Sequence, residues 1–374
     1  MAYRILLVGG GSGGHVFPLF SVAESLKELA EIQNKDIEII LLGEGKFFEN
    51  AVKASGFKYK KIIAGKIRRY FSLLNILDFF KIIAGFFHSF WQMFWLMPDV
   101  VFLKGGYASF FPALAAKIFF IPIYIHDSDS VPGAANRFMA KLAKKVFVSF
   151  ESAKKYFPAE KTELIGNPVR RALLSGDKNT AVSFFGLSSS LPTVVILGGS
   201  QGAKKINDIV LASVVQLTRN FQVIHQTGDK NYGEIKKSLE QLEKELGGPT
   251  SEQIKNRYKI YPFFNESELA LAYALGDVFV SRASAGGIFE ISALGKPAIF
   301  VPIKKSAQNH QHLNALEIVK HGGILIEEEN LISSVFINEI KEAYQKREDL
   351  GLKIKSFAKL DAADKIAATL TQNL

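Results

Sequence analysis

The chain contains the same unit twice, a buried strand followed by a glycine loop and a helix. Arg4–Val8 leads into Gly9–Gly10–Gly11–Ser12–Gly13–Gly14, and Thr193–Leu197 leads into Gly198–Gly199–Ser200–Gln201–Gly202. A glycine loop between a strand and a helix lets the backbone approach a ligand, and the helix N-terminus favours negative charge. The repeat therefore predicts two domains of similar build, each with a loop suited to an anion.

Strand-like and helical patterns alternate along most of the chain, which is typical of right-handed βαβ units and a mostly parallel sheet. Helical patterns include Phe20–Ile32 and Asn207–Thr218. The predicted strands are Arg4–Val8, Ile37–Leu42, Val100–Leu103, Ile123–His126, Lys145–Val148, Thr193–Leu197, Gln222–Gln226, Tyr258–Tyr261, Val278–Ser281, Ala298–Val301 and Gly323–Ile326. We expect an α/β fold of two doubly wound domains that join near Gly166–Asn167–Pro168, and a helical, amphipathic end over Lys353–Leu374 that packs on either domain.

Composition narrows the possible chemistry. The 374 residues include no cysteine, which excludes disulfides, thiolate metal sites and cysteine nucleophiles. The net charge of +10 favours anionic partners such as phosphates, nucleotides or an anionic membrane face. Neither glycine loop has the spacing of a dinucleotide-binding or P-loop motif.

One segment departs from ordinary composition. Tyr70–Met97 is rich in Phe, Leu, Ile and Trp, and it follows a basic stretch that contains Lys58, Lys60, Lys61, Lys66, Arg68 and Arg69. Basic residues beside an aromatic helix describe a segment that lies on an anionic leaflet. A core helix over Phe79–Met97 and a true membrane span remain alternatives. Because no secretory signal is recognisable at Met1–Val8, we expect a cytoplasmic protein.

Several polar residues follow predicted strands or loops. His15 begins the first helix and suits proton transfer or a phosphate contact, or else caps the helix. Arg170, at the junction, suits phosphate oxygens or is a surface arginine. Glu290 lies one turn inside a helix, where it either binds a ribose diol or is stabilised by the helix dipole. The cluster from Gln308 to Asn314 offers neutral groups for a sugar, and the spacing of His310 and His312 disfavours zinc.

Taken together, these stretches resemble the MurG family of bacterial N-acetylglucosaminyltransferases. The similar stretches are Gly10–Pro18, Lys104–Ser109, His126–Arg137, Gly166–Arg170, Gly198–Ala203, Arg282–Glu290 with Gly295–Pro297, and Asn309–Gln311 with Asn314–Ala315. The resemblance implies the glycosyltransferase B-type fold, in which two Rossmann-like domains face each other across a cleft. Residues 1–166 would form an acceptor and membrane-docking domain, with a helix of about 352–374 packing back on it, and residues 167–351 would bind the UDP-sugar.

The resemblance also implies the activity and its place in the cell. The enzyme would move N-acetylglucosamine (GlcNAc) from UDP-GlcNAc to the 4-hydroxyl of undecaprenyl-pyrophosphoryl-MurNAc-pentapeptide, which converts lipid I to lipid II with inversion. That step belongs to peptidoglycan synthesis, and through it to cell-wall biogenesis, cell shape, cell division and the cell cycle. The protein would be peripheral on the cytoplasmic face of the inner membrane, docked through Lys58–Met97, with neither a metal nor another cofactor and with no nucleic-acid partner.

Site residues carry over by matching position. Ser200 and Arg170 would hold the diphosphate, Glu290 the ribose, and the backbone of Phe264 the uracil edge. The helix start Ala285, Gly286, Gly287, Ile288, Phe289 and Glu290 would cradle the α-phosphate, and Gln311 would contact the sugar. Ser12, Gly13 and Gly14 with His15 would face the acceptor and the sugar, and His15 would act as the base.

The chain departs from the family at one stretch. It reads His126–Asp127–Ser128–Asp129 where the family usually reads His-Glu-Gln-Asn. Asp129 stands where an asparagine would help to position GlcNAc, and a carboxylate accepts hydrogen bonds but does not donate them. Asp129 is also a second candidate for the base.

Three other functions stay open. A glycolipid synthase that uses a diacylglycerol acceptor would share the membrane surface. A UDP-GlcNAc 2-epimerase would share the fold without needing that surface. A non-catalytic membrane-associated nucleotide-sugar binder would follow if Asp129 marks lost activity.

Overall fold

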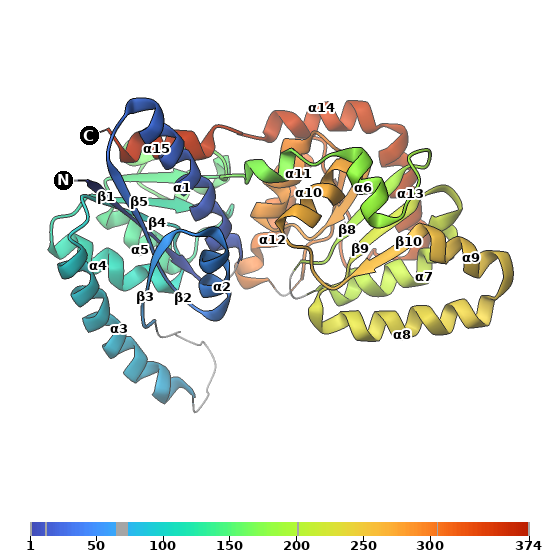
Figure 1. The fold of residues 1–374 in the computed structure, drawn as a ribbon, viewed down its shortest axis with the longest axis horizontal. Helices are drawn as coiled ribbons and strands as arrows, with labels where there is room; N and C mark the ends of the chain where they lie inside the picture. The colour runs from blue at the N-terminus through green and yellow to red at the C-terminus, as the bar shows by residue number, and fades with distance from the viewer. Residues whose placement is uncertain (1, 12, 65–73, 200–201, 305, 373–374) are drawn as a thin grey trace. The chain divides into compact units, whose positions relative to one another are not determined.

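The computed structural model describes residues 2–11, 13–64, 74–199, 202–304 and 306–372. The contacts divide the chain into two units, Met1–Arg170 with Lys359–Leu374 and Arg171–Ala358 (Figure 1). Ser12, Ser200 and the basic residues Lys66, Arg68 and Arg69 lie outside the described residues.

The first unit contains a parallel sheet of seven strands among the described residues, in the order β3-β2-β1-β4-β5-β6-β7. This order reverses direction between β1 and β4, as in a doubly wound Rossmann-like sheet. The strands are β1 (Tyr3–Gly10), β2 (Ile37–Glu44), β3 (Lys58–Lys61), β4 (Val100–Leu103), β5 (Ile123–Asp127), β6 (Lys145–Val148) and β7 (Thr162–Leu164).

Helices cover both faces of this sheet because successive side chains of each strand point to opposite sides. The helices are α1 (Gly13–Gln33), α2 (Lys46–Ser55), α3 (Leu74–Leu96), α4 (Phe110–Ile118), α5 (Ala134–Leu142) and α15 (Ala362–Leu370), with short 3₁₀ turns at Tyr107–Ser109, Glu151–Tyr156 and Ala159–Lys161. Leu6 and Val8 of β1 pack toward α3, α4 and α5, whereas Ile5 and Leu7 pack toward α1, α2 and α15.

The second unit repeats this topology with six strands in its described part, in the order β10-β9-β8-β11-β12-β13. The strands are β8 (Thr193–Leu197), β9 (Gln222–Gln226), β10 (Tyr258–Tyr261), β11 (Val278–Ser281), β12 (Ala298–Phe300) and β13 (Ile324–Leu325). All of the paired strands are parallel. The prediction of two parallel α/β domains is confirmed.

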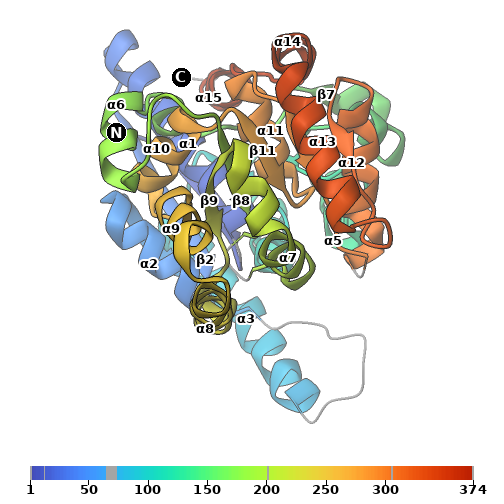
Figure 2. The same cartoon turned by 90° about the vertical axis from the view of Figure 1, so that its right-hand side faces the viewer.

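The helices of the second unit again cover both faces (Figure 2). They are α6 (Lys178–Phe185), α7 (Lys204–Asn220), α8 (Asp229–Leu246), α9 (Gly248–Arg257), α10 (Glu266–Leu275), α11 (Ala285–Leu294), α12 (His310–Val319), α13 (Ser333–Gln345) and α14 (Arg347–Phe357), with 3₁₀ turns at Arg171–Leu174 and Ala307–Asn309. Side chains of α7, α9 and α13 share one core with β8, β11 and β12. On the other face Phe279 of β11 contacts Tyr273 of α10, with ring centroids 5.6 Å apart.

The end of the chain differs from the single amphipathic helix that the sequence predicts over Lys353–Leu374. The helix is interrupted between Phe357 and Ala362, so α14 packs against α11 of the second unit and α15 packs against α1 of the first. The first unit ends at Arg170, whereas the sequence suggested residue 166. The chain returns to the first unit at Lys359, whereas the sequence suggested a return at about residue 352.

Two strands were missed because neither shows a hydrophobic pattern. Strand β3 reads Lys-Tyr-Lys-Lys and forms one edge of the first sheet, whereas β7 has three residues and forms the other. An edge strand with charged side chains is a common way to keep an open sheet from pairing with another chain.

Candidate functional site

The carboxyl ends of β1, β4 and β5 meet at one edge of the first sheet. Ligands of doubly wound domains bind at this edge, beside the point where the strand order reverses. The edge carries the glycine loop and His15 after β1, Lys104 after β4, and Asp127 with Asp129 at the end of β5. Polar groups that are distant in sequence therefore come together here.

His15 lies in the first turn of α1, and its ring is partly exposed. Its Nδ1 atom is buried and has no hydrogen-bond partner within the described residues. Burial lowers the pKa of His15, and the charge of Lys104 lowers it further, against weaker opposite effects from Asp129 and the Lys104 backbone. The ring is therefore a neutral imidazole at neutral pH, which is the form that accepts a proton.

Lys104 is fully buried at the end of β4, and its backbone N–H donates to the Val8 carbonyl of β1 at 2.8 Å. Its Nζ lies 2.8 Å from Nδ1 of His126 and also donates to the hydroxyl of Ser128. Ser128 in turn donates to Oδ1 of Asn167 at 2.8 Å. These bonds fix the turn that carries Asp129.

Asp127 closes the other side of this network. Its carboxylate accepts from the Asn136 side chain at 2.7 Å and from the Asp129 backbone at 3.0 Å. Asn136 also accepts from the backbone of Gly106 at 3.1 Å. Gly105 has a φ of 88°, and a side chain there would collide with Asn136, so only glycine allows this approach. The loop after β4 is thus fixed to the carboxylate at the end of β5.

Two further residues of the first unit surround the glycine loop. Tyr107 hydrogen-bonds Glu44 at the end of β2, and burial and this carboxylate raise the pKa of the phenol. Arg170 is buried and lies over the ring of Phe17 of α1, 4.0 Å from its centroid. The assignment of Arg170 to a diphosphate stays a prediction.

In the second unit, α11 begins with a capping serine and two glycines. Ser284 is the N-cap, and its hydroxyl accepts from the Gly287 N–H at 3.3 Å. Ile288 and Phe289 are buried, so only the backbone of this turn faces outward, through Gly286 and Gly287. The first N–H groups of a helix have no partner within the helix and favour an anion.

Glu290 lies one turn further along α11 and is partly exposed. One of its carboxylate oxygens accepts from the Tyr273 hydroxyl of α10 at 3.1 Å. This contact fixes the orientation of the carboxylate, and the assignment of Glu290 to a ribose stays a prediction.

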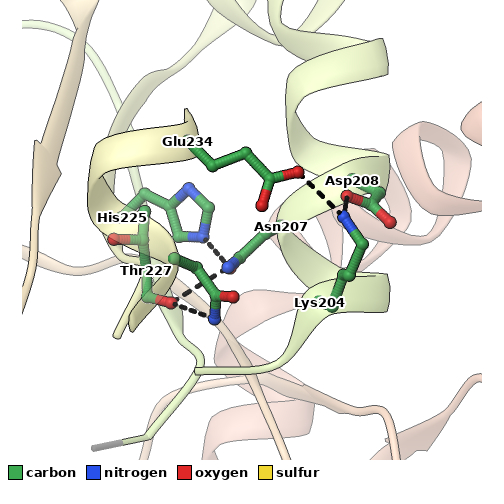
Figure 3. A network of polar contacts seen from close by, with 7 residues as sticks. Lys204, Asn207, Asp208, His225, Thr227 and Glu234 are labelled. Atoms are coloured by element: carbon green, nitrogen blue, oxygen red, sulfur yellow. Dashed lines mark hydrogen bonds and ion pairs between the residues drawn. The ribbon is translucent and has the colours of Figure 1, made fainter. Parts of the chain in front are cut away.

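The glycine loop after β8 rests on a neutral polar network (Figure 3). Asn207 donates to the Thr227 carbonyl at 2.9 Å and accepts from His225 at 3.0 Å, and His225 contacts the Tyr258 hydroxyl at 2.8 Å. Gly202 has a φ of 74°, and a side chain there would collide with the Thr227 carbonyl. Arg282 donates from the next strand end to the Gly198 carbonyl at 3.3 Å.

Two other predicted residues are buried. The side chain of Gln311 accepts from the Ile303 N–H at 3.1 Å, which leaves its amide NH₂ as the group that a sugar could meet. The ring of Phe264 packs edge-on against Phe185, 6.0 Å between centroids, and the assignment of its backbone to uracil stays a prediction. Asn314 donates to the Ala283 carbonyl at 3.3 Å and so ties α12 to the loop before α11.

Sequence reasoning missed several of these groups. Tyr273 and Arg282 orient a carboxylate and a glycine loop, Lys104 and Glu44 lie at strand ends of the first sheet, and Asn136 lies in the first turn of α5. The available signal was the position of a charged or amide residue directly after a buried strand. Within the described ranges, no group of three or more His, Asp or Glu side chains could hold a metal ion.

The first unit also exposes an apolar surface along α3 and the turn after α4. Its exposed residues are Ile83, Phe87, Trp91, Phe94, Trp95, Met97, Ile118 and Phe120. Phe119 joins the two parts, because its ring lies 5.3 Å from Phe90 and 6.2 Å from Phe94 of α3. Phe120 is 92% exposed and has a φ of 58°, a backbone conformation that is strained for an aromatic residue. We refer to these eight residues as the aromatic face.

Lysines near this surface differ in their pairing. Lys58 and Lys61 of β3 form ion pairs with Glu38 and Glu49, at 2.9 Å and 2.7 Å. Lys81 of α3 and Lys117 of α4 are exposed. Among the described helices, none is both long and apolar enough to cross a bilayer.

Comparison with known proteins decides the family. Residues 5–148 match the glycosyltransferase family 28 N-terminal domain, and residues 193–370 match the glycosyltransferase family 28 C-terminal domain. The chain belongs to glycosyltransferase family 28. The resemblance to MurG that the sequence indicated is confirmed.

Curated family 28 relatives match over nearly the whole chain. A "UDP-N-acetylglucosamine--N-acetylmuramyl-(pentapeptide) pyrophosphoryl-undecaprenol N-acetylglucosamine transferase" of Treponema denticola is 34% identical, over 96% of this chain and 93% of the relative. The protein of the same name in Legionella pneumophila is 33% identical, over 100% of this chain and 97% of the relative.

Solved structures show the same family 28 fold. MurG of Acinetobacter baumannii superposes with a TM-score of 0.73 at 22% identity, over 99% of both chains. UDP-GlcNAc 2-epimerase of Neisseria meningitidis bound to UDP-GlcNAc superposes with a TM-score of 0.66 at 16% identity, over 99% of this chain and 100% of that chain. At these identities the likeness concerns the fold, which the transferase and the epimerase share.

Proposed function

We propose that this protein transfers GlcNAc from UDP-GlcNAc to the 4-hydroxyl of the MurNAc unit of undecaprenyl-pyrophosphoryl-MurNAc-pentapeptide. The observation that carries the proposal is the match, over nearly the whole chain, to curated transferases with this donor and acceptor in their names. The product would be lipid II, the disaccharide precursor of peptidoglycan.

The reaction is a direct displacement at the anomeric carbon, with inversion to a β-1,4 bond. His15 takes the proton of the attacking hydroxyl, since its neutral, partly exposed ring lies at the carboxyl edge of the first sheet. Asp129 is the second candidate for this role. It lies beside His15 and favours the imidazolium that forms as the proton arrives.

The second domain binds the donor. The N–H groups at the start of α11 receive a phosphate, and Glu290, held by Tyr273, accepts from the ribose diol. The backbone of Phe264 reads uracil, the amide of Gln311 donates to the sugar, and Arg170 and Ser200 hold the diphosphate. Helix N-termini and an arginine stabilise the charge on departing UDP, so the reaction needs no divalent metal.

The first domain docks on the cytoplasmic face of the membrane through the aromatic face. Exposed Phe and Trp side chains on one side of a helix, with exposed lysines nearby, match a surface that lies in the headgroup region. The strained backbone at Phe120 supports this role, because strained conformations cost free energy and cluster at functional sites.

The test is an acceptor assay with the purified full chain and UDP-GlcNAc labelled in the sugar. We expect label in the lipid fraction with a muramyl-pyrophosphoryl lipid, with the metal chelator EDTA present or absent, and a β-linked product. Label only with diacylglycerol would indicate a glycolipid synthase. Conversion of UDP-GlcNAc to its 2-epimer without an acceptor would indicate an epimerase, and UDP-GlcNAc binding without turnover would indicate a non-catalytic binder.

A further inference from the structure

Lys104 is a buried cation that the roles proposed above do not use. The side chain is 1% exposed, and the two groups that its Nζ contacts, His126 and Ser128, are both uncharged. Burying an ammonium group without a carboxylate in contact is unfavourable, and it persists where the surroundings require the charge.

The hydrogen bonds around Lys104 have a defined direction. The Gly166 carbonyl lies 2.9 Å from Nε2 of His126, and a carbonyl only accepts, so Nε2 carries the proton. Nδ1 of His126 therefore accepts from Lys104. Burial lowers the pKa of His126 well below its usual value, and the charge of Lys104 lowers it further. Lys104 is the donor of the network, and His126 stays neutral.

Two carboxylates act on the charge of Lys104. Asp127 and Asp129, at the end of β5, both favour its protonated form, whereas burial lowers its pKa to about 8. Lys104 is therefore still a cation at the lower pH at which a histidine titrates. Burial and the charge of Asp129 raise the pKa of Asp127, and Lys104 acts in the opposite direction.

The ring of His15 forms a hydrogen bond with the backbone of Lys104. The charged groups that act on its ring are Lys104, which disfavours the imidazolium, and Asp129, which favours it. The remaining titratable groups at this edge are Glu44 of β2, which hydrogen-bonds Tyr107, and Arg170, which lies over Phe17. Lys104 is thus the one group among these described residues that opposes protonation of His15 by its charge.

We propose that Lys104 is a positioning residue for sugar transfer, a buried cation that keeps His15 in its neutral, proton-accepting form and fixes the turn that carries Asp129. The proposal rests on the proposed function, in which His15 accepts the proton of the acceptor hydroxyl. A base must be unprotonated when the acceptor arrives, and the charge of Lys104 adds to the effect of burial in favouring the neutral ring. Asp129 then pairs with the imidazolium.

The first experiment measures the pH dependence of kcat/KM for GlcNAc transfer between pH 5 and 9. The base is active when neutral, so the rate falls as the pH drops through the pKa of His15. Lys104→Met removes the charge and keeps the length, and we expect the acidic limb to move up by about 1 pH unit. Lys104→Arg keeps the charge and should keep the wild-type limb. A wild-type limb in Lys104→Met would overturn the proposal.

Ser128→Ala is the matched control for a purely structural role. It removes one hydrogen bond of Lys104 and leaves the charge in place. We expect a lower rate at every pH with the acidic limb unmoved. If Ser128→Ala shifts the limb as far as Lys104→Met does, the charge of Lys104 is not the cause and the proposal fails.

The second experiment does not depend on turnover. The full chain is labelled with ¹³C at histidine, and the signal of His15 is identified by its loss in His15→Gln. The pKa read from this signal should be below the usual 6.5 in the wild type and higher in Lys104→Met. An unchanged pKa would overturn the inference even in an active enzyme. Absence of transfer with a pKa that does respond to Lys104→Met would instead overturn the proposed function.

Discussion

The two glycine loops rest on polar networks of different character. The network of the first domain contains a buried lysine, two carboxylates and a histidine with an unpaired buried nitrogen. In the second domain His225, Asn207, Thr227 and Tyr258 are all neutral and hydrogen-bonded to one another. The charged residues near them, Lys204, Asp208 and Glu234, form exposed ion pairs with one another (Figure 3). Burial lowers the pKa of His225 to about 3, so its ring does not titrate near neutral pH.

This difference indicates a division of labour. Charged groups that influence one another's protonation suit a proton transfer. A neutral network with every bond made keeps a loop rigid, which suits the binding of a nucleotide diphosphate by backbone N–H groups. We therefore expect substitutions in the first network to change the rate and its pH dependence, and those in the second to change donor affinity and stability.

The largest expected effect comes from His15→Ala. Loss of a general base should lower kcat by about 10²–10⁴-fold. The affinity for UDP, measured by titration calorimetry on the full chain, should stay at the wild-type value because the proposed contacts to UDP come from residues other than His15. Near-wild-type turnover would move the role of base to Asp129.

Glu290→Gln should weaken UDP binding by about 10–100-fold, because hydrogen bonds to a charged group contribute about 1.5–3 kcal/mol. The variant keeps the size of the side chain and a contact for Tyr273. KM for UDP-GlcNAc should rise while kcat stays close to wild type. The control is Glu317→Gln, which removes a surface ion pair with Lys320 and should leave KM unchanged.

Asn207→Leu tests the neutral network. It leaves the His225 ring nitrogen without its partner and the Thr227 carbonyl with only the 3.3 Å bond from Asn231, and an unsatisfied buried polar group costs about 1–3 kcal/mol of stability. Chemical denaturation followed by circular dichroism measures the loss. The neighbouring Asp208→Ala removes only an exposed ion pair with Lys204 and should leave the denaturation midpoint unchanged. Equal losses of stability in both variants would show that the neutral network does not stabilise the fold.

The smallest expected effect comes from Asp129→Asn. The charge of Asp129 raises the pKa of His15, so its removal lowers that pKa. The acidic limb of kcat/KM should move to lower pH by less than about 1 unit, opposite in sign to the shift from Lys104→Met. A shift in the same direction as Lys104→Met would contradict the electrostatic account of the first network.

The sequence predicted the strands because each is a short, buried run of apolar residues. Val100–Leu103 and Thr193–Leu197 match β4 and β8 residue for residue. The sequence did not predict β3, because its lysines show no hydrophobic pattern. It also did not predict the break after α14, because the apolar residues on the two sides of the break belong to one amphipathic pattern but pack into different cores. Periodicity reports that a face is buried, not which core buries it.

Candidate site residues could be proposed from the sequence where their neighbours in the chain suggest a role. His15 and Glu290 follow glycines at helix starts, a position that suggested a role, and the family resemblance then assigned it. Lys104 and Tyr273 were not predictable as site residues, since their roles depend on what lies across the sheet or on a neighbouring helix. A lysine after a hydrophobic strand reads as a solvated loop residue until the structure shows it buried.

The most direct test of the division of labour is the transfer rate as a function of UDP-GlcNAc concentration, measured side by side for the wild type, His15→Ala and Glu290→Gln at saturating lipid acceptor. The account predicts that His15→Ala lowers kcat with KM kept, and that Glu290→Gln raises KM with kcat kept. The account would be contradicted if the two variants changed the same parameter, or if each changed the one assigned to the other.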